Sequence, residues 1–130
     1  MAANIPSFSG VSEEDFMKKY GNNNTACIQW LFAARTGSSG VRCAKCGKVT
    51  HHEYYKPYLS YKCQVCGSYY YPVTGTIYQK GGVPIWKWFY GAWMIYNMGG
   101  RNVSVGLYCK KAEVTIKQGS YVMKTLLKAL

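Results

Sequence analysis

Two cysteine pairs in the middle of the 130-residue chain constrain its fold most strongly. Cys43 and Cys46 are separated by two residues and followed by glycine, and Cys63 and Cys66 repeat this pattern, with sixteen residues between the pairs. Such a turn lets two sulfurs reach one ion, and the glycine tolerates a backbone that points amides at the thiolates. The spacing therefore predicts one structural Zn²⁺, with all four positions filled by Cys43, Cys46, Cys63 and Cys66.

The other cysteines and both histidines are predicted to lie outside this site. Cys27 and Cys109 fall in apolar, helical contexts and are expected to be buried thiols. His51 and His52 lie between the pairs and could replace a cysteine ligand, but four sulfurs already satisfy zinc, so we expect both on a strand surface that is open to phosphate. A catalytic pair of cysteine and histidine would have only Glu53 to orient it. We therefore predict no catalytic residue among them.

Charge is distributed unevenly along the chain. Sixteen Lys and Arg against five Asp and Glu give a formal charge of +11, yet residues 1–40 are neutral because they hold three acids and three bases. The excess predicts a polyanionic partner, with DNA favoured over RNA and no small-molecule substrate. Two carboxylates beyond residue 40 are too few for a two-metal nuclease or transposase site or a glycosidase pair. The sequence thus predicts a protein that is not an enzyme.

Hydropathy and the N-terminal sequence indicate the cellular compartment of the protein. No segment reaches the roughly 18 apolar residues of a membrane span, and no targeting segment is evident. Paired cysteines without a signal peptide favour a reducing compartment over disulfides. We expect an intracellular protein without a membrane partner, in the nucleus, the nucleoid or the cytoplasm.

Periodicity predicts an α+β fold in three segments. Residues 1–39 form a helical lead, with a short helix capped by Ser12 and a second helix up to Arg35. Residues 40–82 form a zinc ribbon with a small antiparallel sheet. Residues 83–130 hold a central helix over Ile85–Asn97, then a helix-turn-helix over 103–130 that turns at 112–114 and is capped by Thr115. The last helix should face the core with Met123, Leu126, Leu127 and Leu130.

Tyrosines concentrate in the predicted ribbon. Eight of the thirteen fall between residues 54 and 78, interleaved with lysines. Rings beside cations stack on unpaired bases, but rings in a small ribbon also supply apolar area to its core. Alternation along a strand predicts that some rings face each way, and both interpretations stay open.

A basic surface is predicted along the ribbon and the helix-turn-helix. In that motif the start of the second helix reaches base edges, and the first helix contacts the backbone. The residues expected to contact nucleic acid are Arg42, Lys45, Lys48, Lys56, Lys62, Lys80, Arg101, Lys110, Lys111, Thr115, Lys117, Gln118, Ser120, Tyr121 and Lys124.

Several short motifs follow one another in a characteristic order. They are Ala26-Cys27, Trp30-Leu31, Gly40-Val41-Arg42-Cys43, Tyr61-Lys62-Cys63, Thr74-Gly75-Thr76-Ile77, Val83-Pro84-Ile85-Trp86-Lys87-Trp88, Val103-Ser104, and Val114-Thr115 with Lys117. Over residues 12–128 the chain resembles the N-terminal zinc-ribbon and helix-turn-helix module of Merlin-like insertion-sequence transposases. In that family an acidic, metal-binding catalytic domain follows. The resemblance implies a DNA-binding part without its catalytic part, with Glu113 replacing a turn glycine and Gly119 inside the recognition helix.

Two functions follow from these features. The preferred one is a non-enzymatic protein that binds nucleic acid, with duplex DNA favoured. The alternative is a structural zinc-ribbon subunit of a larger protein or ribonucleoprotein complex, whose basic surface meets RNA or acidic protein.

Overall fold

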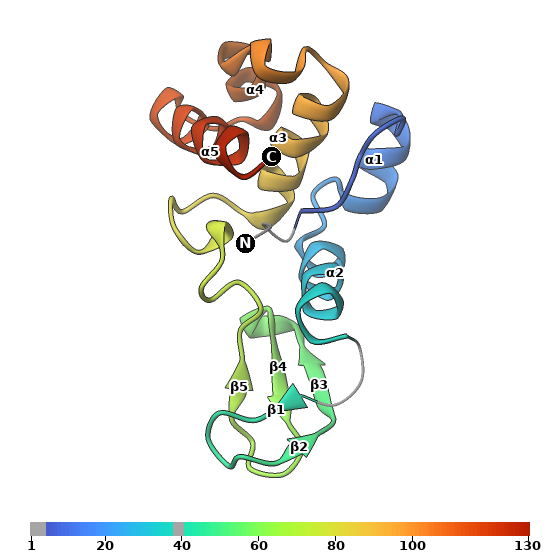
Figure 1. The fold of residues 1–130 in the computed structure, drawn as a ribbon, viewed down its shortest axis with the longest axis vertical. Coiled ribbons are helices and arrows are strands. Elements are labelled where there is room, and N and C mark those ends of the chain that lie inside the picture. The colour runs from blue at the N-terminus through green and yellow to red at the C-terminus, as the bar shows by residue number, and fades with distance from the viewer. Residues whose placement is uncertain (1–4, 38–40) are drawn as a thin grey trace.

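A computed structural model of the protein describes residues 5–37 and 41–130. Within these ranges the chain is α+β, with five α-helices and two small antiparallel sheets. The strands lie at one end of the long axis, and α4 and α5 lie toward the other end (Figure 1). The predicted fold class is therefore confirmed at this level, and the division into three domains stays a prediction.

The two N-terminal helices begin at polar caps. They are α1, Glu13–Tyr20, and α2, Asn24–Thr36. Ser12 Oγ accepts from the backbone N–H of Asp15 at 3.1 Å, and Asn23 Oδ1 accepts from that of Ala26 at 3.1 Å. Gly37 ends α2 with φ 75°, a left-handed conformation that favours glycine. Both helices predicted for this part of the chain are therefore present.

The segment before α1 is extended and anchored on the core. Phe8 is buried, with its ring 5.4 Å from that of Phe16 and 5.9 Å from that of Phe89. The Trp93 indole N–H donates to the Val11 carbonyl at 2.8 Å, and the Asn97 side-chain amide donates to the Phe8 carbonyl at 2.9 Å. The segment before α1 is therefore packed against the core. The sequence did not indicate this packing, because the segment has no hydrophobic periodicity.

Five short strands form two separate sheets, where one was predicted. Strands β1, Val41–Arg42, and β2, Val49–Thr50, form one hairpin; β3, His52–Tyr55, β4, Ser60–Cys63, and β5, Tyr69–Tyr70, form the other sheet in the order β3-β4-β5. The break falls at His51, whose carbonyl accepts from Gln64 N–H at 3.2 Å beyond the end of β4. The β3–β4 hairpin turns through a 3₁₀ helix, η1, Lys56–Tyr58, and two more 3₁₀ turns are η2, Ile77–Gln79, and η3, Gly100–Asn102.

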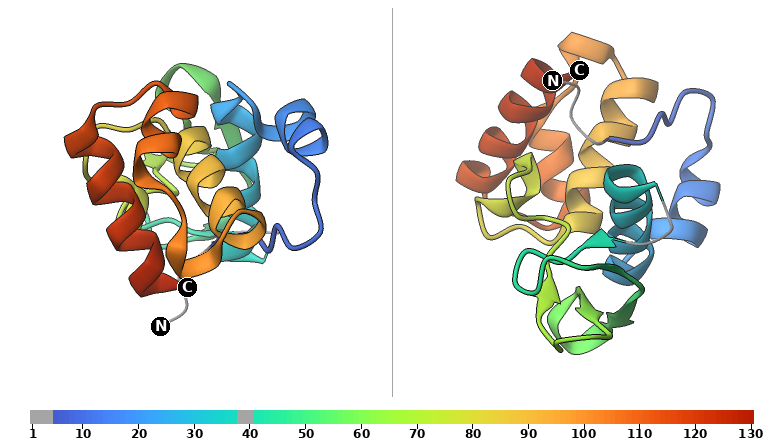
Figure 2. Two further views of the ribbon diagram at one scale, coloured as in Figure 1. Left: turned by 90° about the horizontal axis from the view of Figure 1, so that it is seen from above. Right: turned by 60° about the horizontal axis from the view of Figure 1, so that its bottom comes forward.

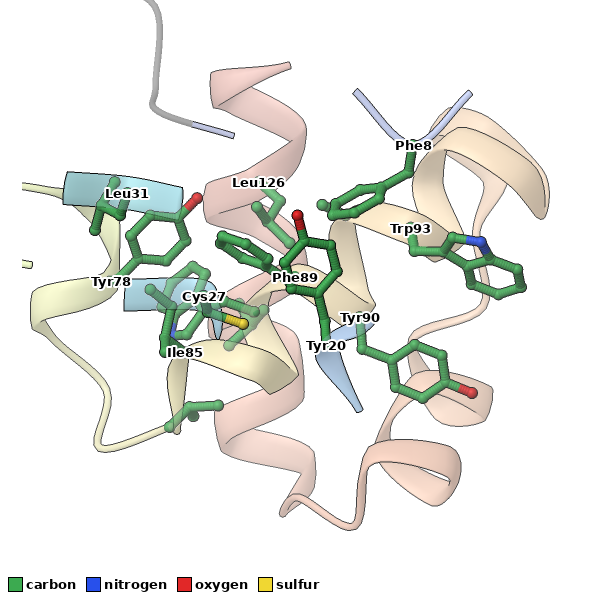
Figure 3. Packing of buried hydrophobic residues seen from close by; sticks show 14 of the residues in the cluster. Phe8, Tyr20, Cys27, Leu31, Tyr78, Ile85, Phe89, Tyr90, Trp93 and Leu126 are labelled. Carbon is green, nitrogen blue, oxygen red and sulfur yellow. The ribbon is translucent and has the colours of Figure 1, made fainter. Parts of the chain in front are cut away.

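Helix α3, Ile85–Asn97, has the predicted bounds and is the centre of the molecule. Its side chains Trp88, Phe89 and Met94 are fully buried, because α1, α2, α4 and α5 all pack against this helix. Figure 3 shows Phe89 beside Tyr20, with Leu126 of α5 behind it and Cys27 of α2 nearby. A helix that is apolar nearly all round is buried on several sides, as the sequence predicted.

The last two helices are joined by a tight turn. They are α4, Val105–Ala112, and α5, Ile116–Ala129. Glu113 adopts the left-handed conformation with φ 57°, which explains why glycine suits this turn position. Thr115 caps α5 in a reciprocal capping box with Gln118, confirming the predicted start. The prediction for Leu130 is wrong, because it follows the last helical turn and is 43% exposed.

Helix α2 connects the strands to the helical core. The Phe32 ring stacks on Tyr61 of β4, with centroids 3.6 Å apart and planes within 9°. Thr25 Oγ1 lies 2.9 Å from the Tyr54 hydroxyl, and the Arg35 guanidinium donates to two carbonyls of the segment after β5, those of Pro72 and Thr74, both at 2.7 Å. The strands are therefore held against one helix of the core.

Across residues 5–37 and 41–130, no helix combines the length and apolar character that a bilayer crossing requires.

The close contact between α4 and α5 generates a stability prediction. A Cβ at Gly119 would lie 2.1 Å from the Cys109 sulfur, so glycine is needed here for packing. We expect Gly119→Ala to lower the free energy of unfolding by about 2 kcal/mol, although alanine normally favours a helix. Adding Cys109→Ala removes the sulfur and should recover part of the loss, measured by denaturant unfolding of both single variants and the double variant. A Gly119→Ala protein more stable than the parent would contradict this packing.

Glu13 generates a second prediction, on acid stability. Its Oε2 accepts from the Tyr90 hydroxyl and from Lys111 Nζ at 3.0 Å, and these two hydrogen bonds, Tyr90 first, lower the pKa of Glu13 below 4.5. The carboxylate therefore stabilises the fold above pH 4.5, and this contribution is lost as the pH falls through the lowered pKa. At pH 7 Glu13→Gln should cost about 1 kcal/mol, since the site is partly exposed.

The matched control is Glu14→Gln, which removes the same charge from an exposed pair with Lys18 at 3.6 Å. Unfolding of the three proteins across pH 3 to 7 should show the Glu13→Gln deficit shrinking below pH 4.5 and almost no deficit for the control. A pH-independent deficit would show that shape, and not charge, makes the Glu13 contribution.

Candidate metal centre

The four cysteines lie in two matching turns. Cys43 follows β1 and Cys46 lies in the turn to β2, while Cys63 ends β4 and Cys66 lies in the turn to β5. In each turn the first cysteine donates its N–H to the carbonyl five residues ahead, from Cys43 to Lys48 at 3.0 Å and from Cys63 to Ser68 at 2.8 Å.

The glycine after each pair closes the turn. Gly47 N–H donates to the Cys43 carbonyl at 2.9 Å, and Gly67 N–H donates to the Cys63 carbonyl at 3.0 Å. Their φ angles, 75° and 78°, lie in the left-handed region. Both turns thus place their two sulfurs on one side of the backbone.

All four sulfurs lie within 4.8 Å of one another. Cys43 Sγ is 3.5 Å from Cys66 Sγ, and Cys46 Sγ is 4.0 Å from Cys63 Sγ. Sulfurs bound tetrahedrally at the zinc–thiolate bond length lie about 3.8 Å apart, so these separations suit one ion. The cluster could hold a single metal ion, and both cysteine pairs contribute to it as predicted.

Hydrogen-bond donors around the cluster favour thiolates, the form of cysteine that binds metal. The N–H groups of Cys46 and Lys45 each lie 3.4 Å from Cys43 Sγ, and Ser68 Oγ lies 3.1 Å from Cys43 Sγ and 3.0 Å from Cys66 Sγ. The Cys46 N–H, followed by the Ser68 hydroxyl, lowers the pKa of Cys43 to about 5. Ser68 also lowers the pKa of Cys66.

Cys46 shows the opposite tendency. The Lys48 backbone N–H lowers its pKa, but burial and the three neighbouring sulfurs outweigh that effect and raise the pKa to about 11. Four thiols this close do not all ionise unless a cation compensates their charge. The donor set therefore fits a divalent ion. Ser68, which sequence reasoning missed, is recognisable only as the residue two positions after the last cysteine.

Four cationic side chains surround the cluster at the surface. Arg42 Nη1 donates to the Gly47 carbonyl at 2.7 Å and so braces the first turn. Lys45, Lys48 and Lys62 are exposed, and no carboxylate of the described residues pairs with them. Because four thiolates and a divalent ion carry net negative charge, these cations offset part of it.

One histidine differs from expectation. His51 is exposed as predicted, but His52 is only 5% exposed, and its Nδ1 lies 3.1 Å from the Thr50 carbonyl. It pairs with Cys63 and lies on the same face of β3 as Tyr54, which points toward α2. The prediction of a surface position for His52 is therefore wrong.

The residues predicted to contact nucleic acid are spread over both ends of the molecule. All are exposed except the half-buried Gln118. Lys56 lies in η1, Lys80 follows η2, Arg101 lies in η3, and Lys110 lies in α4. Lys111 is engaged with Glu13, and the capping box engages Thr115 and Gln118. The remaining members are Lys117, Ser120, Tyr121 and Lys124 of α5 and the four cations beside the cysteines, Arg42, Lys45, Lys48 and Lys62.

Helix α5 carries a row of exposed polar side chains. Lys117, Ser120 and Lys124 recur at helical spacing, and Lys128, absent from the prediction, continues the row. Tyr121 is 40% exposed, and its ring packs edge-to-face on Trp88 with centroids 6.0 Å apart. The same periodic reasoning, carried one turn further, would have found Lys128.

Comparisons with known proteins found no matching family model, curated protein or solved structure. The cysteine cluster and the exposed cations are therefore the features from which function is inferred.

The cluster predicts one bound metal ion per chain in reduced protein. Cys63→Ser removes a buried sulfur and should abolish stoichiometric binding, whereas Cys109→Ala removes a cysteine outside the cluster and should leave it intact. Elemental analysis measures the metal content.

Chelation should increase amide hydrogen exchange across residues 41–71, since metal binding and local folding are coupled. Purified reduced protein without metal, or with exchange unchanged after verified chelation, would refute the assignment.

Proposed function

We propose that the protein is a non-enzymatic, zinc-containing nucleic-acid-binding protein whose main ligand is duplex DNA. The observation that carries the proposal is the set of cations beyond residue 40 that lack carboxylate partners. Of these cations, only Lys111 forms an ion pair in the described parts of the chain. Uncompensated surface cations at this density are typical of proteins that neutralise phosphates.

Helix α5 is the proposed DNA-contacting element. It has 14 residues, about 21 Å of helix, and presents the row of Lys117, Ser120, Lys124 and Lys128 to solvent. An α-helix with its side chains is about 10–12 Å across and fits the major groove of B-DNA, which is about 12 Å wide. The short helix and tight turn that precede α5 suit a helix-turn-helix. Lys110, exposed in the last turn of α4, would contact the DNA backbone.

The capping box limits how α5 reads bases. Thr115 and Gln118 satisfy each other, so Lys117 and Ser120 are the remaining side chains near its start. Lysines neutralise phosphates regardless of sequence. We therefore infer binding that rests mostly on the DNA backbone, by a module related to those of Merlin-like transposases.

Zinc is the proposed ion of the cysteine cluster. Four converging thiolates favour tetrahedral zinc or iron, and closed sites of this donor set serve structure. Cys43, Cys46, Cys63 and Cys66 would hold the ion and fasten the turns after β1 and β4, as in a zinc ribbon. The ion would supply folding free energy, and no reaction step is assigned to it.

A second candidate is a structural subunit of a larger protein or ribonucleoprotein complex. Internal engagement of Thr115, Gln118 and Lys111 favours it, because these contacts leave fewer groups free to read DNA. A stoichiometric complex from cells, together with no independent affinity of the purified protein for duplex DNA, would establish it over the first.

Duplex affinity should depend on the α5 row. In fluorescence anisotropy with a labelled duplex, Lys117→Ala/Lys124→Ala should weaken binding to all sequences and reduce the slope of log affinity against log salt by about 2. The matched control, Lys18→Ala/Lys19→Ala, removes the same charge from exposed positions on α1. Equal losses in both variants would show that net charge, and not α5, carries binding. Absence of any duplex binding at low salt would overturn the proposal.

A further inference from the structure

The three-stranded sheet has two faces of different character. Tyr61 of β4 stacks on Phe32, so it faces α2, and its cross-strand partners Tyr54 and Tyr70 face the same way. Side chains alternate along a strand, so Tyr55 and Tyr69 lie on the opposite face. That face points away from α2, toward solvent.

Four tyrosines form a contiguous group on this outer side, and we call Tyr55, Tyr58, Tyr69 and Tyr71 the tyrosine face. The ring centroids of Tyr55, Tyr58 and Tyr69 are 5.0 to 5.4 Å apart, and Tyr71 lies 6.4 Å from Tyr69. Tyr58 is 53% exposed, Tyr71 41% and Tyr55 36%.

The tyrosine face does not serve the core. Tyr61 belongs to the buried hydrophobic cluster, and Tyr54 and Tyr70 pack against it, whereas no member of the tyrosine face takes part. The inward rings thus account for the apolar area that a small sheet needs. Exposed rings that touch one another and cover no core mark a surface for another molecule.

Cations and hollows flank the four rings. Lys45 borders one hollow together with Tyr69, Tyr71 and Ser68, and Lys62 borders a second with Tyr55. Lys56 precedes Tyr58 in η1. Glu53, in the second hollow, is the only carboxylate among strands β1 to β5. The surface therefore offers aromatic rings with positive charge at their margin.

We propose that the tyrosine face binds single-stranded nucleic acid, with unpaired bases stacking on Tyr58, Tyr71 and their neighbours while Lys45, Lys56 and Lys62 contact phosphates. Rings interleaved with lysines suit this ligand because every base has a flat face and every linkage a negative charge. A duplex keeps its bases stacked inside, so it would meet only the lysines. An acidic peptide would likewise contact the lysines but would not stack on the tyrosine rings.

This surface is distinct from α5. The sheet and α5 lie toward opposite ends of the molecule (Figure 1), and a view with the sheet end brought forward keeps them apart (Figure 2). The proposal therefore goes beyond duplex binding by α5 and does not depend on it.

The test measures fluorescence anisotropy of a short labelled oligothymidylate and of its oligouridylate equivalent with reduced, metal-containing protein. Tyr58→Ala/Tyr71→Ala removes the two most exposed rings and should weaken binding by about tenfold or more. Tyr58→Phe/Tyr71→Phe keeps the rings and should bind almost as tightly as the parent. Tyr96→Ala removes a tyrosine of similar exposure, 39%, from α3 and should change nothing.

Melting curves and metal content confirm that each variant is folded, and duplex affinity should be unchanged in the Tyr58→Ala/Tyr71→Ala protein. Conversely, Lys117→Ala/Lys124→Ala should weaken duplex binding and spare the oligothymidylate, so failure of either site is seen separately. The proposal is overturned if the parent does not bind either oligonucleotide at low salt, or if the alanine and phenylalanine pairs bind alike. Displacement of the oligothymidylate by polyglutamate at equal charge would also overturn it in favour of an acidic protein ligand.

Discussion

The convergence of four sulfurs is the constraint on which the strand-containing end depends. Its strands are two to four residues long and form two sheets, whereas isolated hairpins are only marginally stable in water. The cysteine turns, which belong to different sheets, bring the sulfurs of Cys43 and Cys66 to 3.5 Å from each other. An ion bound there would supply the stabilisation that strands this short cannot obtain from a hydrophobic core of their own. The outward rings of β3 and β5 lie on the sheet that includes one of these turns.

The helical core supplies the second support for that end. Stacking of Phe32 on Tyr61 and the two carbonyl contacts of Arg35 join α2 to the strands and to the segment that follows them. Because α2 also packs on α3, these contacts connect the strands to the centre of the helical core. Such a contact fixes the orientation of the sheet: one tyrosine side faces protein and the other faces water.

Features with a strong local signal could be predicted from the sequence. The bounds of α3 follow from an apolar run after Pro84 that only Lys87 interrupts, the start of α5 from Thr115, and the sulfur cluster from cysteine spacing. Features made by distant partners could not. The burial of Phe8 and His52, the contact of Ser68 with the Cys43 sulfur, and the convergence of Tyr90 and Lys111 on Glu13 all depend on segments whose proximity only the tertiary fold creates. Leu130 fits the helical period but lies past the last residue of α5, where helical spacing no longer predicts which side chains are buried.

The glycine-rich link between η2 and α3 lies against α5. A Cβ at Gly81, whose φ is 97°, would approach the ring of Tyr121 to 3.1 Å. The shape of the α5 surface is therefore set partly by a residue forty positions earlier in the chain. A substitution at position 81 would therefore press on the Tyr121 ring and shift it by a few tenths of an ångström, although every residue of α5 stayed the same.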